Sequence, residues 1–188
     1  MTLLALELPV PEGDTVARFW ASVRHNDGHY LAFLISFVAI AAAWNQHHHV
    51  FDYLERVDAR LRTLNLVWLL MLVLNPFATK LLTTEGQDTL VTHALKFGFY
   101  ALLQTVAAAA MTAMVHRMIA RSLQRPGTPS TLVGETDRHN LGIFLGFGLS
   151  IPVFFVTKDG WVLWFAAPLL IRAVRRFLDR EGPEPEAV

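Results

Sequence analysis

The chain has 188 residues, no cysteine and no net formal charge at pH 7. Hydrophobic residues make up 53% of it and charged residues only 17%, whereas soluble domains usually carry about 25% charged residues. The balanced charge offers no basic field for nucleic acid, and the lack of cysteine excludes disulfides, thiolate metal sites and cysteine nucleophiles. Because the apolar residues gather in long runs, the composition predicts an all-α integral membrane protein.

The N-terminal segment is apolar but short. Residues 1–8 are followed at once by Pro9, and they lack the basic start and the cleavage site of a signal peptide. Eight helical residues cover about 12 Å, against a hydrocarbon core of about 30 Å. We therefore expect residues 1–8 to be the C-terminal end of a first transmembrane helix whose beginning is missing.

Longer apolar stretches fill the transmembrane helical domain that we expect over residues 9–178. They predict spans at about 29–49, 61–82, 89–115, 139–156 and 160–178. Only Thr157-Lys158-Asp159-Gly160 joins the last two apolar stretches, which predicts an antiparallel helical hairpin there. Together with the remnant this indicates a six-span subunit, and residues 179–188 should form a disordered tail.

The basic residues predict the orientation. One set of connections and the chain's end hold most of them: Arg56, Arg60, Arg62, Arg117, Arg121, Arg125, Arg138, Arg172, Arg175, Arg176 and Arg180. Since basic loops stay in the cytoplasm, we expect a multi-pass protein of the cell (plasma) membrane with a cytoplasmic C-terminus.

Three consecutive histidines, at positions 47 to 49, are the most conspicuous group. Successive helical residues lie about 100° apart, so the three cannot converge on one metal ion, and we expect no metal or cofactor. Trp44, His47 and His48 end one predicted span while Asn65 begins the next, so all four share a depth. We expect Trp44, His47 or His48, and Asn65 to form a polar network between helices.

Other polar residues lie inside the predicted spans, and none is acidic at mid-depth, which argues against a proton or sodium relay. They are Ser36, Asn75, Gln104 and Thr105, with Lys96 nearer the outer end. The pair His48 and Asp52, at i and i+4, is the one candidate for an intramembrane enzyme, although interleaved acidic and basic residues nearby are typical of a solvated helix face.

Three ordered stretches together resemble a known family. They are Ser36-Phe-x-x-Ile40-x-x-x-Trp44-x-x-His47-His48-x-x-Phe51, then Arg56-Val-Asp58-x-Arg60-x-x-x-Leu64-Asn65, then Pro76-Phe77-x-Thr79-x-Leu81-Leu82. This set, over about residues 1–86, is similar to the short prokaryotic form of the transmembrane protein 175 family of potassium channels. The family's first helix opens with Arg and Phe-Ser-Asp-Gly; here only its ending is present, as Thr2-Leu3-Leu4-Ala5-Leu6-Glu7-Leu8.

The resemblance implies a homotetramer in the lipid bilayer that conducts potassium ions through a leak-type pore lined by the first helices, with no enzymatic activity. By resemblance, the pore face carries Thr2 and Leu6, and the network of Trp44, His47, His48 and Asn65 packs against the Phe-Ser-Asp segment. Two alternatives remain open from the residues: a small intramembrane enzyme using His48 with Asp52 or Glu55, and an accessory membrane subunit.

Overall fold

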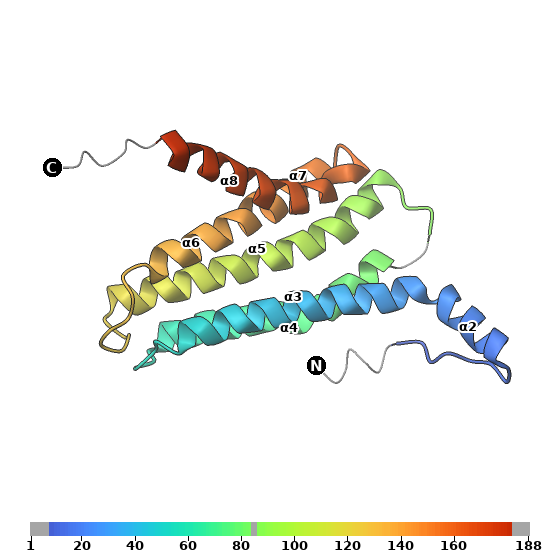
Figure 1. The fold of residues 1–188 in the computed structure, drawn as a ribbon, viewed down its shortest axis with the longest axis horizontal. Coiled ribbons are helices and arrows are strands. Elements are labelled where there is room, and N and C mark those ends of the chain that lie inside the picture. Colours follow the sequence, from blue (N-terminus) through green and yellow to red (C-terminus); the bar gives the residue numbers. More distant parts are fainter. Residues whose placement is uncertain (1–7, 84–85, 182–188) are drawn as a thin grey trace.

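The computed structural model describes residues 8–83 and 86–181, and this part of the chain is helical throughout its regular structure (Figure 1). The longer helices are α3 (Asp27–Phe51), α4 (Ala59–Thr83), α5 (Leu90–Ala120) and α8 (Val162–Glu181), and the shorter ones are α2 (Val16–His25), α6 (Leu132–Ile143) and α7 (Leu149–Phe154). A π-helical turn, η1 (Phe144–Gly148), joins α6 to α7, and a 3-10 turn, η2 (Lys158–Trp161), precedes α8. Thr2 and Leu6 lie outside the described residues.

Within residues 8–83 and 86–181, three helices are long and apolar enough to cross a membrane: α3, α4 over Ala59–Leu82, and α5. A helix of 25 residues, such as α3, covers about 38 Å, which exceeds the ~30 Å of hydrocarbon. Many large apolar side chains on these helices remain exposed, among them Leu34, Leu70 and Leu102. An apolar exterior of this kind is stable in lipid, and the chain is an all-α integral membrane protein.

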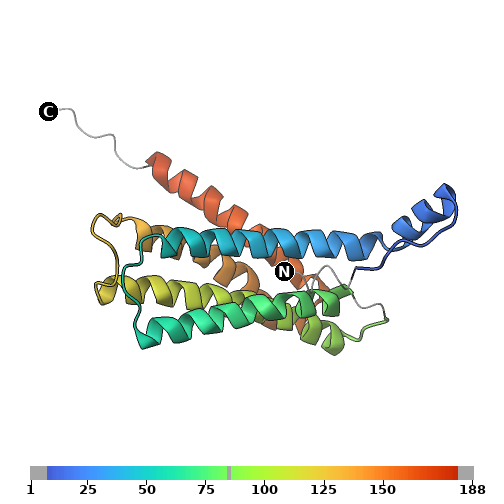
Figure 2. The ribbon, with the colours of Figure 1, turned by 90° about the horizontal axis from the view of Figure 1, so that it is seen from below.

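The long helices run side by side, with α4 packed along α5 and α3 packed along α4 (Figure 1, Figure 2). The largest buried cluster lies where α3, α4, α5 and α6 meet, and it includes Trp68, Met111 and Met114. The other end of α5 packs instead on η1, α7 and α8 through aromatic side chains. Helix α5 is therefore the common support of both halves of the bundle.

Helix α8 packs closely on η1 because Gly146 has no side chain. A Cβ atom at Gly146 would lie 3.0 Å from the backbone oxygen of Leu163 in α8. The Trp164 indole stacks on Phe147 with ring centroids 4.9 Å apart, and its Nε1–H donates to Ser150 Oγ at 2.8 Å. The Ser150 hydroxyl in turn donates to the Phe147 carbonyl at 2.7 Å, so the partly buried indole and the buried hydroxyl are both satisfied.

An acidic side chain joins the start of α4 to the end of α5. Asp58 Oδ1 accepts from the Leu61 backbone N–H at 2.7 Å, as an N-terminal cap does, and Asp58 Oδ2 accepts from Arg117 at 2.6 Å. The backbone hydrogen bond from Leu61 and the guanidinium of Arg117 hold the pKa of Asp58 below its ordinary value of 3.8. Ionised Asp58 therefore stabilises the fold above that ordinary pKa, and the contribution is lost as pH falls through the lowered pKa.

We expect Asp58→Asn to keep an acceptor oxygen for Leu61 while losing the charge that faces Arg117. Its unfolding midpoint in detergent should be lower than that of the parent protein at neutral pH, and the difference should shrink as pH falls toward 3. Asp52→Asn is the matched control, because the Asp52 carboxylate is exposed and lies 3.9 Å from its nearest basic group, His48. If the difference in unfolding midpoint between Asp58→Asn and the parent did not change with pH, the stabilisation could not come from the charge of Asp58.

Candidate functional site

A polar layer in the described part of the chain joins four helices, α3, α4, α5 and α6, and it lies near the end of α3. Helix α3 ends at Phe51 and α4 begins at Ala59, so a short connection returns the chain antiparallel to itself. Side chains in the last two turns of α3 therefore lie at the same depth as those in the first two turns of α4.

The first contact in this layer joins His47 to Asn65. His47 Nε2 lies 2.8 Å from Asn65 Oδ1. An amide oxygen only accepts hydrogen bonds, so in this contact the His47 Nε2 carries the proton and donates it. The contact links α3 to α4 by a hydrogen bond between side chains, which is how polar residues are accommodated in a membrane bundle.

Aromatic rings enclose His47. Its imidazole stacks on Phe51 with centroids 3.9 Å apart and on Trp68 at 4.3 Å, and Trp44 stacks more loosely at 5.8 Å. Trp68 is buried, whereas Trp44 is 54% exposed and lies at the outer edge of the group. The structure thus brings together Trp44, His47 and Asn65 of the residues singled out from the sequence.

His48 lies apart from this group. It is the next residue along α3, and one helical step of about 100° turns it away from α4. Its side chain is 69% exposed, and its Nε2 is 3.9 Å from the exposed carboxylate of Asp52. The structure therefore places His47, and not His48, against Asn65. Within the described residues no three His, Asp or Glu side chains are grouped so as to hold a metal ion.

A second contact in the same layer centres on Asn140, which the sequence analysis did not identify. Asn140 is fully buried in α6; its Nδ2 donates to Thr112 Oγ1 at 2.7 Å and to the Ala108 carbonyl at 3.3 Å, both in α5. Gln46 of α3 donates from Nε2 to Asn140 Oδ1 at 3.2 Å. The sequence does contain a signal for this contact. Asn140 is an uncharged amide at the start of an apolar run, at the depth where Gln46 lies near the end of its own run.

A third polar contact lies in the other half of α3 and α4. Ser36 donates from Oγ to Thr79 Oγ1 at 2.7 Å, and the Thr79 hydroxyl donates to the Asn75 carbonyl at 3.0 Å. Asn75 precedes Pro76, which has no backbone N–H and so weakens the local helical hydrogen bonding. The buried Ser36 thus bonds α3 to Thr79 of α4, and Thr79 in turn bonds to the buried Asn75 within α4, beside the proline.

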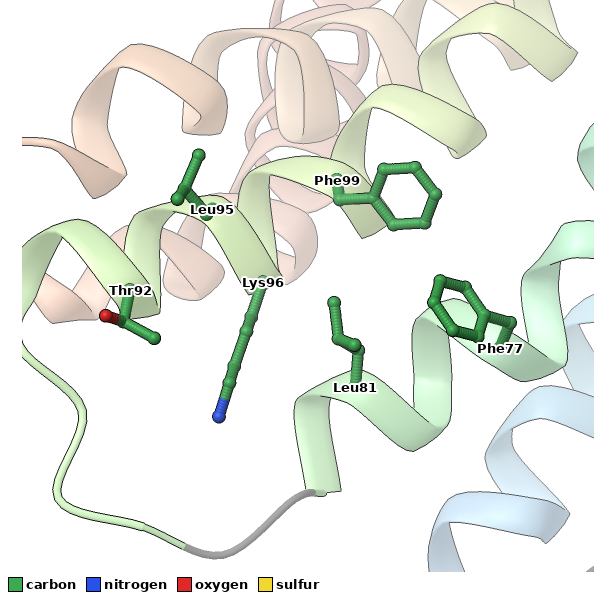
Figure 3. A pocket seen from close by; sticks show the side chains of 6 residues that line it. All are labelled: Phe77, Leu81, Thr92, Leu95, Lys96 and Phe99. Atoms are coloured by element: carbon green, nitrogen blue, oxygen red, sulfur yellow. The ribbon is translucent and has the colours of Figure 1, made fainter.

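An open, mostly apolar pocket of about 390 Å³ lies between α4 and α5 toward the opposite end of the bundle (Figure 3). Its lining residues are Phe77, Leu81, Thr92, Leu95, Lys96 and Phe99. The Lys96 ammonium lies apart from the rings of Phe77 and Phe99 and is 2.9 Å from Asp88 Oδ2. Because that pair neutralises the one cation in the lining, the pocket offers lipid-like surface and no evident chemistry.

These features define a polytopic helical membrane protein whose buried polar groups connect its helices. A family model described as "Endosomal/lysosomal potassium channel TMEM175" matches residues 1–76. A potassium channel of Streptomyces collinus is 32% identical over 158 residues, which cover 84% of this chain and 76% of the relative. The chain therefore belongs to the TMEM175 potassium channel family.

Two further relatives match over shorter regions. A potassium channel of a Chryseobacterium species is 32% identical over 108 residues, and one of Chamaesiphon minutus is 36% identical over 84 residues. These matches cover 54% and 41% of the relatives' own lengths. No solved structure matches the chain.

We expect His47→Ala to lower the free energy of unfolding by about 1–3 kcal/mol, because it leaves the Asn65 oxygen without its donor and removes the ring stack. The neighbouring His48→Ala is the matched control and should change stability little. Thermal unfolding of both variants in one detergent, followed by size-exclusion chromatography, makes the comparison. Equal losses for the two histidines would contradict the assignment of the network to His47.

We expect Asn140→Leu to destabilise the bundle by a similar amount, about 1–3 kcal/mol, since Gln46 and Thr112 would both lose a buried partner. Asn45→Leu makes the same chemical change on the exposed side of α3 and should be neutral or slightly stabilising in detergent or lipid. The measurement is the unfolding midpoint of each variant. A parent-like midpoint for Asn140→Leu would show that this polar contact contributes no net stability.

Proposed function

We propose that this chain is the subunit of a potassium-permeable, leak-type cation channel that works as a symmetric homotetramer in the cell membrane. The observation that carries the proposal is the match at 32% identity to the Streptomyces collinus potassium channel over 84% of the chain. That match extends well past the first two long helices, so it supports a common subunit design rather than one shared segment.

The way in which polar side chains are paired within the subunit supports a pore built from several copies. His47 is bonded to Asn65, Ser36 to Thr79 and Gln46 to Asn140, so these groups connect helices instead of facing a water-filled path. An ion path then needs a surface contributed by more than one copy. A rotationally symmetric ring closes such a path with identical interfaces.

The proposed pore face carries Thr2 and Leu6, which lie four residues apart and therefore share one side of a helix. Four Leu6 side chains would form an apolar ring that ions cross only while the ring is wide enough to stay wet. Four Thr2 hydroxyls would supply oxygen atoms that replace part of the water lost by a potassium ion. Leu3, Leu4 and Leu8 are assigned to packing between helices.

The distribution of basic residues supports a cytoplasmic C-terminus. Arg60 and Arg62 begin α4, and Arg117 is in the last turn of α5, at the end of the bundle where the α3–α4 and α5–α6 connections lie (Figure 1). The two connections are joined there by the backbone N–H groups of Glu55 and Arg56, which donate to the Leu123 carbonyl at 2.9 and 3.0 Å. Basic residues remain on the cytoplasmic side of membranes, so this end is assigned to the cytoplasm.

The test is potassium flux into liposomes that contain the purified protein. Leu6→Ala should raise conductance and weaken the preference for potassium over sodium, because the apolar ring widens. Thr2→Val should reduce current, because the hydroxyl oxygens are lost at nearly constant volume. Leu4→Ala is the matched control on the opposite side of the helix and should conduct like the parent.

Native mass spectrometry of the same preparation should give a tetramer. A tetramer without cation flux would reject the channel proposal while leaving the assembly intact. Flux that is unaffected by both Leu6→Ala and Thr2→Val would show that another face lines the pore, and a monomer or dimer alone would reject the tetramer.

A further inference from the structure

Helix α2 (Val16–His25) has two chemically different sides. Val16, Phe19, Trp20 and Val23 recur at i, i+3, i+4 and i+7, which places them on one side of the helix. Arg18, Ser22 and His25 lie on the other side. No residue of α2 is buried; Val16 is 76% exposed and Trp20 is 55% exposed. The Phe19 and Trp20 rings meet edge to face at 5.8 Å and form one continuous apolar surface.

The preceding segment of the chain covers the polar side of α2. The Glu12 backbone N–H donates to Ser22 Oγ at 3.1 Å, and Arg18 donates to Asp14 at 2.9 Å. Thr15 caps the helix by accepting from the Arg18 N–H at 3.3 Å. In the part of the chain that the structure describes, no segment covers the apolar side in this way. The partner of the apolar side is therefore something other than these described contacts.

The position of α2 determines which partner is near. Asn26 is the only residue between α2, which ends at His25, and α3, which begins at Asp27 and is one of the helices able to cross the membrane. Both views show α2 leaving that end of α3 at an angle, away from the other helices (Figure 1, Figure 2). Tyr30, in the first turn of α3, donates to the Pro9 carbonyl at 2.7 Å and so holds the preceding segment against the span. Helix α2 therefore lies at the depth where α3 leaves the hydrocarbon.

We propose that α2 binds the interfacial layer of the bilayer, with Val16, Phe19 and Trp20 inserted at the boundary between headgroups and acyl chains. The first turns of α3, which follows α2 directly, also expose apolar side chains: Leu31 and Leu34 are more than half exposed, at 59% and 55%. Tryptophan favours this layer because its ring is apolar and its N–H remains near water.

Charge does not drive this binding. Arg18 is already paired with Asp14, and the carboxylates of Glu12, Asp14 and Asp27 outnumber the guanidinium groups of the same segment, Arg18 and Arg24. Burial of apolar area is the remaining driving force, and it does not require anionic lipid. The proposal concerns the membrane contact of one helix, so it stands independently of ion conduction.

The absence of cysteine allows a direct test by spin labelling. Single variants Phe19→Cys and Trp20→Cys on the apolar side, and Arg18→Cys and Ala21→Cys away from it, carry a nitroxide in the full chain reconstituted into phosphatidylcholine vesicles. At positions 19 and 20 the ratio of collisions with oxygen to collisions with a water-soluble nickel chelate should be several-fold higher than at 18 and 21. The same values are expected after phosphatidylglycerol is added.

Three outcomes would overturn the proposal. Labels at 19 and 20 that collide freely with the nickel chelate would place the apolar side in water. Labels that are immobilised and shielded from both reagents would place it against a second copy of the chain. Oxygen contact that appears only with phosphatidylglycerol would show that charge drives the binding. Unfolding is monitored in each variant by its size-exclusion profile, and Leu31→Cys on α3 provides the reference for a lipid-exposed site.

Discussion

Lipid supplies no hydrogen-bond partners, and this constraint determines where the polar side chains of the bundle lie. A buried polar group without a partner costs about 1–3 kcal/mol, so such groups occur in pairs that join helices. His47 with Asn65, Ser36 with Thr79, and Asn140 with Gln46 and Thr112 are of this kind. Among the described residues, the buried side-chain atoms that lack a partner are Gln104 Nε2 and Gln124 Oε1. Gln104 lies in the middle of α5; its side chain is hydrogen-bonded to Tyr100, while its Nε2 has no partner among the described residues.

Packing inside the bundle follows from the same solvent. Lipid chains are as apolar as leucine, so helices associate through close contact rather than through removal of apolar surface from water. Small residues permit that contact: Ala101 and Ala108 of α5 are buried, and Gly146 lets η1 lie directly on the α8 backbone. The close approach at Ala108 also exposes its carbonyl to Asn140. Small residues and polar contacts therefore act together, because an amide side chain reaches a neighbouring backbone only where that backbone is uncovered.

The sequence predicted the helical membrane architecture and the family, because runs of apolar residues and ordered motifs are properties of the chain itself. It did not distinguish His47 from His48, since the choice depends on the rotation of α3 about its axis, which packing on Trp68 and Asn65 determines. Asn140 was missed for a related reason: it becomes a site only when Gln46 and Thr112, from distant parts of the chain, reach the same depth. The π-helical turn over Phe144–Gly148, which brings Gly146 against the backbone of α8, is specified by no local sequence pattern. The proposed pore residues Thr2 and Leu6 lie outside the described residues and stay predictions.

Two neighbouring residues of α3 determine where that helix lies. Gln46 and His47 are one helical step apart, about 100°, and they bond to different helices: His47 to Asn65 of α4, and Gln46 to Asn140 of α6. Apart from α2, helix α3 packs mainly along α4, so the Gln46 contact is its principal connection to α6. Rotation or sliding of α3 would therefore break the His47–Asn65 and Gln46–Asn140 contacts at once. Because Asn140 is also bonded to α5, the Gln46 contact fixes α3 relative to α5 as well. A helix with an apolar and otherwise lipid-compatible surface is thus held in one register by contacts among three amides and an imidazole.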